Sequence, residues 1–321
     1  MQDNFPRPAM VASNGIRLAV HEAGSGPPVV LLHGFPELAY SWRHQLPALA
    51  AAGYRAIAPD LRGYGGSDKP PTVGDYRMEL LLADITGLLE ALALERAVFV
   101  GHDWGALLLW QLALLRPDVM RGLVALNIPF MPRSARDPVD MMRARFGDNY
   151  YIVNFQDSDE ADRRFAADPA RFIDTMMRRG QITRAAYDQL PAARKVIDLL
   201  AALDRDAPGG ESLLNAGELA YYAAAFAAGG FTAPINWYRN WSANWAAAAG
   251  LPQHVSLPTL FLGAEDDVVI APQQIEAMRP YVDDLEVHMI RGCGHWTQQE
   301  QPALVNRLLI DWLRRRFPPR A

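Results

Sequence analysis

The chain has 321 residues, and 50% of them are hydrophobic, so it is long enough to bury one large core and a smaller appendage. Its net charge of -5 excludes the strongly basic surface that nucleic-acid binding requires, because acidic residues outnumber Lys and Arg. The single cysteine, Cys293, excludes an intramolecular disulfide and is typical of a reducing compartment.

The N-terminal segment, MQDNFPRPAM, contains no apolar leader. No later stretch reaches about eighteen consecutive apolar residues, the length that a membrane-spanning helix needs. We therefore expect a cytoplasmic protein with no membrane or nucleic-acid partner. A homodimer is compatible with this sequence.

Short apolar runs alternate with longer amphipathic stretches in the first part of the chain. Buried strands are predicted for the runs at 27–34, 54–60, 97–103 and 122–129. Helices are predicted at 41–53, at 76–94 and directly after Asp103. The helix at 76–94 has one apolar stripe, made by Met78, Leu81, Leu82, Ile85, Leu88, Leu89 and Leu92. This alternation indicates an α/β protein whose mostly parallel sheet is covered by helices on both faces.

The pattern changes after Pro129. From about 131 to 245 the sequence contains helical stretches without convincing strands, and strand patterns return at 257–267 and 285–296, before a closing helix at 302–316. We therefore expect a helical cap inserted into an α/β core. The predicted division is 1–130 for the first part of the core, 131–245 for the cap and 246–321 for the second part of the core.

The sequence GHDWG at 101–105 joins a predicted strand to a predicted helix. Hydrolases with a Gly-x-Ser-x-Gly turn at such a junction expose a serine nucleophile there. Here Asp103 stands in place of the serine. The motif by itself is weak, because an aspartate at this position is equally well interpreted as the N-cap of the following helix.

A carboxylate at this turn has a chemistry of its own. A helix N-terminus stabilises its ionised form by about 0.3–2 kcal/mol, so Asp103 needs no base to attack an sp³ carbon. The product is an ester of Asp103, and its hydrolysis needs an oxyanion hole and a general base. We assign the oxyanion donors to the backbone N–H groups of Phe35, in LLHGFPE, and Trp104. We interpret His33, in the same segment, as a structural residue.

The base and its orienting acid should follow the nucleophile along the chain, at loops after later strands. His295 lies in such a loop between glycines, in GCGHW, whereas the other histidines lie before or within predicted elements or inside the GHDWG turn. A structural role is the alternative for His295. The acid is Asp266 or Asp267 in GAEDDVV, and the spacing does not distinguish them.

With these residues in these positions, the chain resembles the epoxide hydrolases of the α/β-hydrolase fold over nearly its whole length. The resemblance lies in HGFPELAYSWRHQLPALAAAGYRAIAPDLRGYGGSDKP, GHDWG, INWYRN and GCGHWTQQEQP, which occur in the order of that family. It implies an α/β-hydrolase fold with a helical cap, an Asp103 nucleophile, an oxyanion hole from Phe35 and Trp104, and a His295 base. The family's acid falls on Asp267, because AEDDVV matches the pattern A-E-x-D-x-V.

The resemblance also implies two cap tyrosines that bind and protonate the epoxide oxygen. INWYRN places one at Tyr238, and alignment of NYYIVNFQ favours Tyr151 over Tyr150 for the other. An alkoxide is a poor leaving group, so a phenol donor contributes about 10²–10⁴-fold as a general acid. The alternative is that each tyrosine only packs the cap on the core.

Two other functions compete with hydrolysis of a small apolar epoxide to a vicinal diol. A haloalkane dehalogenase shares the turn and would use the Trp104 indole to bind halide, but it has no use for paired tyrosines. A small-molecule-binding protein of this fold would keep the pocket without turnover, and a turnover assay distinguishes it from an enzyme. No metal or organic cofactor is expected, because the sequence contains no C-x-x-C or H-E-x-x-H pattern.

Overall fold

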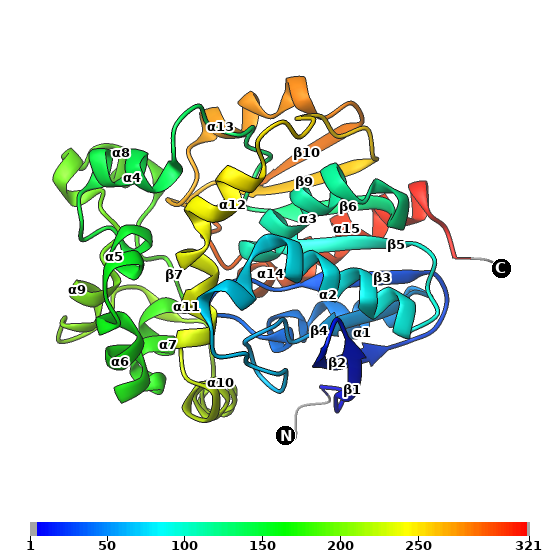
Figure 1. Ribbon diagram of the computed structural model, residues 1–321, viewed down its shortest axis with the longest axis horizontal. Coiled ribbons are helices and arrows are strands. Elements are labelled where there is room, and N and C mark those ends of the chain that lie inside the picture. Colours follow the sequence, from blue (N-terminus) through cyan, green and yellow to red (C-terminus); the bar gives the residue numbers. More distant parts are fainter. Residues whose placement is uncertain (1–4, 320–321) are drawn as a thin grey trace.

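A computed structural model describes residues 5–319 (Figure 1). Its centre is an eight-stranded sheet in the order β1-β2-β4-β3-β5-β6-β9-β10. β2 pairs antiparallel with both β1 and β4, and every other neighbouring pair in this sheet is parallel, as predicted. The strands are β1 (Ala9–Ser13), β2 (Ile16–Ala23), β3 (Pro28–Leu32), β4 (Arg55–Pro59), β5 (Ala97–His102), β6 (Met120–Leu126), β9 (Thr259–Ala264) and β10 (Leu285–Ile290).

The hairpin β1–β2 was not among the predicted strands. Polar residues such as Arg17 and His21 interrupt its apolar pattern, since the hairpin lies at one edge of the sheet. The turn between the two strands is Asn14-Gly15, and both residues have positive φ, 46° and 76°. An Asn-Gly pair is a strong hairpin signal, and it could have predicted this element.

Neighbouring residues of the central strands point to opposite faces of the sheet. In β3, Val30 and Leu32 belong to one apolar cluster, whereas Val29 and Leu31 belong to another. Helices α2 and α3 cover the first face, and α1 and α15 cover the second. The core helices are α1 (Gln45–Ala51), α2 (Met78–Ala91), α3 (Trp104–Leu115), α13 (Pro272–Ala277), α14 (Thr297–Glu300) and α15 (Pro302–Arg316).

The cap lies between β6 and β9 in the chain and forms one side of the molecule, drawn from green to yellow in Figure 1. One apolar cluster extends from the core into the cap and includes Phe155, Phe172 and Trp237. Trp237 packs on Trp104 of α3, with 5.6 Å between ring centroids. A pair of two-residue strands, β7 (Arg178–Arg179) and β8 (Glu211–Ser212), joins the helices. The boundaries at 130 and 245 stay predictions, and α12 ends at Ala247.

The cap helices are short. They are α4 (Pro138–Phe146), α5 (Tyr151–Asp157), α6 (Glu160–Ala167), α7 (Pro169–Met176), α8 (Arg184–Asp188), α9 (Leu199–Leu203), α10 (Ala216–Gly229), α11 (Thr232–Arg239) and α12 (Trp241–Ala247). Short 3-10 helices occur at Ala39–Trp42, Val73–Tyr76, Pro117–Val119, Ala192–Arg194 and Arg279–Tyr281.

Helix α11 is joined to core segments by two hydrogen bonds. The Trp237 indole N–H donates to the Arg62 carbonyl at 3.0 Å. Directly after α11, the Asn240 amide donates to the Val73 carbonyl at 2.6 Å. The helix therefore has a set position over the carboxyl ends of the parallel strands.

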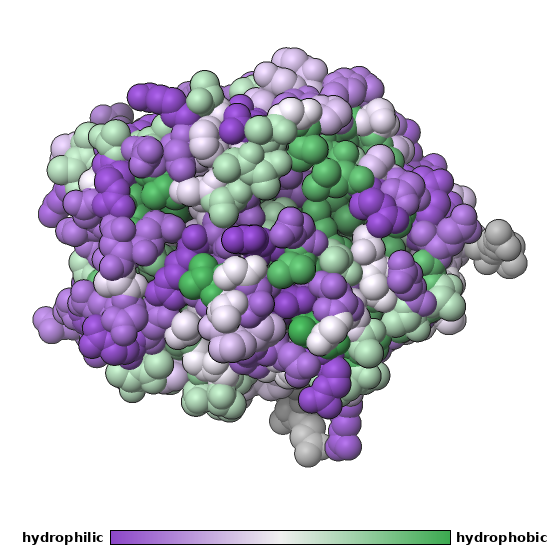
Figure 2. Space-filling model, in the orientation of Figure 1, coloured by the Kyte–Doolittle hydropathy of each residue, from purple (hydrophilic) through white to green (hydrophobic). Residues whose placement is uncertain are grey.

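The face of the molecule drawn in Figure 2 has both hydrophilic and apolar areas. Figure 2 shows hydrophilic residues over most of the cap and apolar residues in separate areas between them. Within residues 5–319, no helix combines the length and apolar character that crossing a membrane requires.

Candidate active site

Asp103 occupies the sharp turn between β5 and α3. Its φ of 52° and ψ of -118° lie in a region that residues other than glycine rarely adopt. It holds the N-cap position of α3, but its side chain makes no capping hydrogen bond. The carboxylate accepts instead from the Phe35 N–H in the loop after β3, a contact that the N-cap interpretation does not predict.

Two glycines permit the close approach of this turn to β3. A Cβ at Gly105 would lie 2.0 Å from the Leu32 carbonyl oxygen. A Cβ at Gly34 would lie 2.4 Å from the Asp103 Cβ. Any larger residue at either position would push the Asp103 carboxylate away from the loop that follows β3.

Both predicted oxyanion donors contact the Asp103 carboxylate. The Phe35 N–H donates to Oδ1 at 2.9 Å, and the backbone N–H of Trp104 acts on the same carboxylate by lowering its pKa. Burial raises the pKa of Asp103, and the charge of His295 together with these two donors lowers it in part. The side chain is 12% exposed, so it remains accessible.

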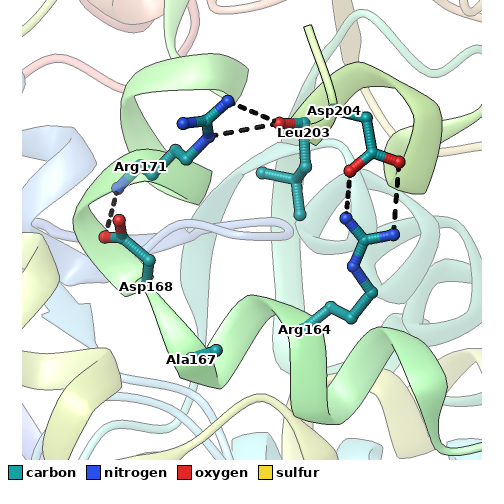
Figure 3. Close-up of a pocket in the computed structure, with 6 residues that line it drawn as sticks. All are labelled: Arg164, Ala167, Asp168, Arg171, Leu203 and Asp204. Carbon is teal, nitrogen blue, oxygen red and sulfur yellow. Dashed lines mark hydrogen bonds and ion pairs between the residues drawn. The ribbon is translucent and has the colours of Figure 1, made fainter. Parts of the chain in front are cut away.

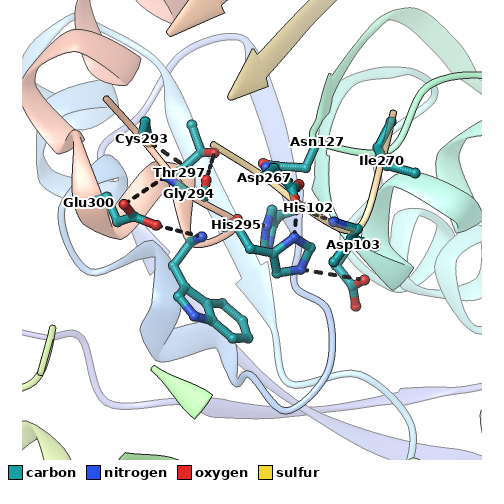
Figure 4. A network of polar contacts seen from close by, with 12 residues as sticks. His102, Asp103, Asn127, Asp267, Ile270, Cys293, Gly294, His295, Thr297 and Glu300 are labelled. Carbon is teal, nitrogen blue, oxygen red and sulfur yellow. Dashed lines mark hydrogen bonds and ion pairs between the residues drawn. The ribbon is translucent and has the colours of Figure 1, made fainter. Parts of the chain in front are cut away.

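His295 lies between two carboxylates (Figure 4). Its Nε2 is 3.8 Å from Asp103 Oδ2, and its Nδ1 is 3.0 Å from Asp267 Oδ2. Burial acts to lower the pKa of His295, but the charge and hydrogen bond of Asp267, with a contribution from Asp103, raise it to about 9. The predicted nucleophile, base and acid are therefore brought together in one row.

The two adjacent aspartates have different partners. Asp267 accepts hydrogen bonds from Asn127 Nδ2 at 2.7 Å and from the Val269 N–H at 2.9 Å, in addition to His295 (Figure 4). Burial acts to raise the pKa of Asp267, but these contacts and the charge of His295 outweigh burial and lower it. Asp266 instead accepts from the Arg184 N–H of the cap at 2.7 Å. The structure thus brings Asp267, and not Asp266, to the histidine.

A third buried carboxylate, Glu37, was not assigned from the sequence. It accepts from His102 Nδ1 at 2.7 Å, from the Gly34 N–H at 2.8 Å and from Gln298 Nε2 at 2.7 Å. Burial acts to raise the pKa of Glu37, but the charge and hydrogen bond of His102 outweigh burial and lower it. His102 Nε2 lies 2.7 Å from the carbonyl oxygen of His295, so the network links the oxyanion loop to the base.

Glu37 and Asn127 could have been suspected from one signal. Each is a polar residue that comes soon after a buried parallel strand, where the sites of open α/β sheets lie. His33, predicted to be structural, accepts from the Leu61 N–H through Nε2 at 3.0 Å and so ties the loop after β3 to the loop after β4.

The loop that carries His295 is held by Glu300. This carboxylate accepts from the N–H groups on both sides of the histidine, Gly294 at 2.8 Å and Trp296 at 3.0 Å. Cys293 lies in the same loop, and burial raises the pKa of its thiol, so it remains a neutral packing residue.

The predicted cap tyrosines also meet. Tyr151 is the first residue of α5 and Tyr238 lies in α11, and their ring centroids are 5.7 Å apart. The Tyr238 ring packs edge-on against Trp104, with 5.1 Å between centroids. Burial raises the pKa of both phenols well above 10, and the charge of Asp103 adds to this, so both hydroxyls keep their protons at neutral pH.

Tyr150, the alternative to Tyr151, has different surroundings. Its ring stacks on Phe146 with 4.6 Å between centroids. Burial and Tyr187 raise its pKa to about 12, and the charge of Asp103 is not among the causes. The structure therefore brings Tyr151 rather than Tyr150 to Tyr238.

The described chain contains other polar clusters outside this site. Over residues 5–319, no group of three or more His, Cys, Asp or Glu is arranged to hold a metal ion. A hollow on the cap between α6, α7 and α9 is lined by charged residues that pair with one another (Figure 3). There Arg164 contacts Asp204, and Arg171 donates to the Leu203 carbonyl. The two arginines that line this hollow therefore already have partners.

Comparison with known proteins gives consistent matches. The alpha/beta hydrolase fold family matches residues 27–302. Epoxide hydrolase A of Mycobacterium tuberculosis is 42% identical over 320 residues, covering 96% of this chain and 97% of that protein. Bifunctional epoxide hydrolase 2 of Sus scrofa is 37% identical and covers 93% of this chain, which spans about half, 53%, of that relative. The crystal structure of epoxide hydrolase A from Mycobacterium thermoresistibile has a TM-score of 0.87 and 41% identity, covering 96% of this chain and 98% of that one.

Proposed function

The chain belongs to the epoxide hydrolases of the α/β-hydrolase fold, and from this premise we propose that it opens the epoxide ring through a covalent ester on Asp103. The observation that carries the proposal is the position of the Asp103 carboxylate, under two backbone N–H donors and 3.8 Å from the imidazole of His295. The product is a vicinal diol.

In the first step, an oxygen of Asp103 attacks one ring carbon. The bond from that carbon to the ring oxygen breaks, and the electron pair passes to the oxygen. The phenols of Tyr151 and Tyr238 hold this oxygen, and one of them donates its proton. Since burial raises the pKa of both phenols, they enter the step protonated, as a general acid must. The result is a hydroxyalkyl ester of Asp103.

In the second step, His295 Nε2 removes a proton from water, and the water oxygen attacks the ester carbonyl carbon of Asp103. The negative charge that develops on the carbonyl oxygen is stabilised by the N–H groups of Phe35 and Trp104, which already contact this carboxyl group. The bond to the alkyl oxygen breaks, and that oxygen takes the proton from His295. The second proton of the water, left on the Asp103 carboxyl group, returns to the phenolate formed in the first step, and the diol leaves.

The charge on Asp103 contributes to the pKa of His295, although Asp267 contributes more. In the free protein this charge is one of the causes that raise the pKa of His295 to about 9. The ester is neutral, so its formation removes that cause and lowers the pKa of His295 when a base is needed. Asp267 keeps the ring oriented through Nδ1.

The substrate is a small apolar epoxide. The aromatic side chains around Asp103 support this choice, because they offer apolar surface with two hydroxyls as the polar groups. These side chains are Phe35, Trp104, Tyr151, Phe155 and Tyr238. The paired phenols also favour an epoxide over a haloalkane, because a halide leaves without a proton.

The ester is tested directly by one variant. We expect His295→Gln to form the ester and to fail to hydrolyse it, so that its intact mass increases by the mass of one substrate. His254→Gln is the control, because that histidine is half-exposed at the surface beside Asp283 and should leave turnover complete. Asp103→Asn should form no ester.

The origin of the product oxygen gives a second readout. A single turnover of the wild-type protein in ¹⁸O-labelled water should place the label in the Asp103 carboxyl group and leave the diol unlabelled. Labelled diol together with unlabelled Asp103 would mean that water attacks the epoxide directly, and the ester mechanism would be rejected.

A further inference from the structure

A short cap helix contacts the loop that carries the acid. The loop at 265–271 joins β9 to α13 and contains Asp267. Arg184, the first residue of α8, reaches this loop with both its backbone and its side chain. Its N–H donates to Asp266 Oδ1 at 2.7 Å, and its Nη2 donates to the main-chain carbonyls of Asp267 and of Ile270, the latter at 2.5 Å.

The Arg184 guanidinium is committed to these carbonyls. Its side chain is 14% exposed, and its nearest carboxylate, Asp188, lies 3.6 Å away. Hydrogen bonds from a charged donor are roughly twice as strong as neutral ones, and one nitrogen here spans two carbonyls that are three residues apart. By contrast, the backbone N–H of Asp267 reaches only the Ala264 carbonyl, at 3.4 Å. Core contacts also hold this loop, among them those of Asn127 and Val269 with the Asp267 carboxylate, and Arg184 adds the contacts that come from the cap.

We propose that Arg184 is a positioning residue, which fixes the acid loop and thereby the orientation of Asp267 toward His295. Through it, the cap controls the hydrolysis of the ester. This inference rests on the proposed function, because it concerns the second step of that reaction.

The first step depends on other contacts. Asp103 is held by Phe35 and Trp104, and the phenol of Tyr238 is carried by a helix fixed to the core through Trp237. Helix α5 is joined to this helix by Gln156, whose amide donates to the Tyr238 carbonyl at 2.9 Å. Loss of the Arg184 side chain should therefore leave ester formation almost unchanged and slow ester hydrolysis.

Single-turnover kinetics of Arg184→Ala test this separation. We expect ester decay to slow by about 10- to 100-fold, and ester formation to change by less than about twofold, because a small misplacement of a catalytic group affects only the step in which it acts. In the steady state kcat and KM should fall together, because the ester accumulates, and kcat/KM should hold.

Arg178→Ala is the matched control. Arg178 is a cap arginine with similar exposure, 13%, and its guanidinium also donates to main-chain carbonyls of another segment, those of Gly209 at 2.7 Å and Gly210 at 3.0 Å. It contacts Asp174 of the cap as well, with an ion pair at 2.9 Å. Both carbonyls belong to the cap, so this variant removes the same kind of contact without touching the acid loop. Its ester decay should match that of the wild type.

Arg184→Lys tests whether a conservative substitution restores ester decay. It also serves as a second variant if Arg184→Ala does not fold. A lysine can donate to one of the two carbonyls, so ester decay should recover part of the lost rate. The inference is overturned if the ester decays at the same rate in Arg184→Ala and Arg178→Ala. It is also overturned if Arg184→Ala slows ester formation and ester decay equally. Absence of the ester in the wild type would instead reject the proposed function itself, so the two failures are distinguishable.

Discussion

At the scale of single residues, the chemistry depends on which of two neighbours in the sequence enters the site. Asp267 faces His295, whereas Asp266 faces Arg184 of the cap. Tyr151 lies against Tyr238, whereas Tyr150 stacks on Phe146. In each pair the residue type is the same, and the direction of the backbone decides the role.

The tyrosine pair gives a test at this scale. We expect Tyr151→Phe and Tyr238→Phe each to slow ester formation by about 10- to 100-fold, because each removes one of two donors to the epoxide oxygen, and the double variant to lose it. Stopped-flow measurement of a single turnover separates this step from hydrolysis. Tyr150→Phe is the control and should form the ester at the wild-type rate. If Tyr150→Phe formed the ester more slowly than Tyr151→Phe, Tyr150 and not Tyr151 would be the donor to the epoxide oxygen.

The residues around the row Asp103, His295 and Asp267 were partly predictable. The three themselves follow from the GHDWG turn, the GCGHW loop and the family pattern. Asn127 and Glu37 were missed, because their partners lie 140 and 65 residues away in the chain and no local pattern joins them. Arg184 was missed for the same reason, since its contacts with the acid loop span 83 and 86 residues.

At the scale of elements, the turn at Asp103 depends on the close approach of α3 to the end of β3. Gly105→Ala would place a Cβ 2.0 Å from the Leu32 carbonyl, which is backbone and cannot rotate away. We expect a loss of about 1–3 kcal/mol in the free energy of unfolding, measured with urea, and a slower ester formation as the Trp104 N–H moves.

Gly74→Ala is the control for this substitution. Its Cβ would meet only Arg77 Nε, at 4.0 Å, so the free energy of unfolding should stay within about 0.5 kcal/mol of the wild type. Equal stability of the two variants would mean that the turn relaxes without cost, and that the close approach of β3 and α3 is not required.

The elements of the core were more predictable than those of the cap. Buried parallel strands are continuous apolar runs, and β3, β4, β5, β6, β9 and β10 all fall on predicted runs. Most ends shift little, but β10 ends at Ile290, well before the predicted end at 296. The closing helix α15 begins and ends at the predicted residues. The cap helices have five to fourteen residues, too few turns for a periodic pattern to define their ends.

At the scale of the whole molecule, the buried charges couple stability to pH. The pKa of His295 is raised from 6.5 to about 9 in the folded chain, so its pairing stabilises the fold fully below pH 6.5 and is lost as the pH rises through about 9. We expect the difference in unfolding free energy between the wild type and His295→Gln to shrink over this range, measured with urea at several pH values.

The same measurement has an internal control. His254 pairs with Asp283 at the surface, where its side chain is 50% exposed and solvent screens the interaction. His254→Gln should therefore change the unfolding free energy little across the same pH range. A constant difference between wild type and His295→Gln through pH 9 would contradict the raised pKa of His295.

The overall plan, a mostly parallel sheet with an inserted helical cap and an active site where they meet, was predicted from the alternation of strand and helix patterns and from the resemblance. The continuity of the apolar cluster from α3 into the cap was not predicted, because it depends on side chains that only the folded chain brings together. It implies that core and cap unfold as one cooperative unit.

The insertion of the cap between β6 and β9 also orders events during synthesis. A ribosome completes the strand before Asp103 early, then makes the whole cap, and releases the segments with Asp267 and His295 last. Until β9 emerges, β6 is an open edge of the growing sheet, and edges of this kind invite pairing with other chains. The nascent chain therefore contains the proposed nucleophile, Asp103, well before the segments with Asp267 and His295, and β6 stays unpaired on one side until β9 is made.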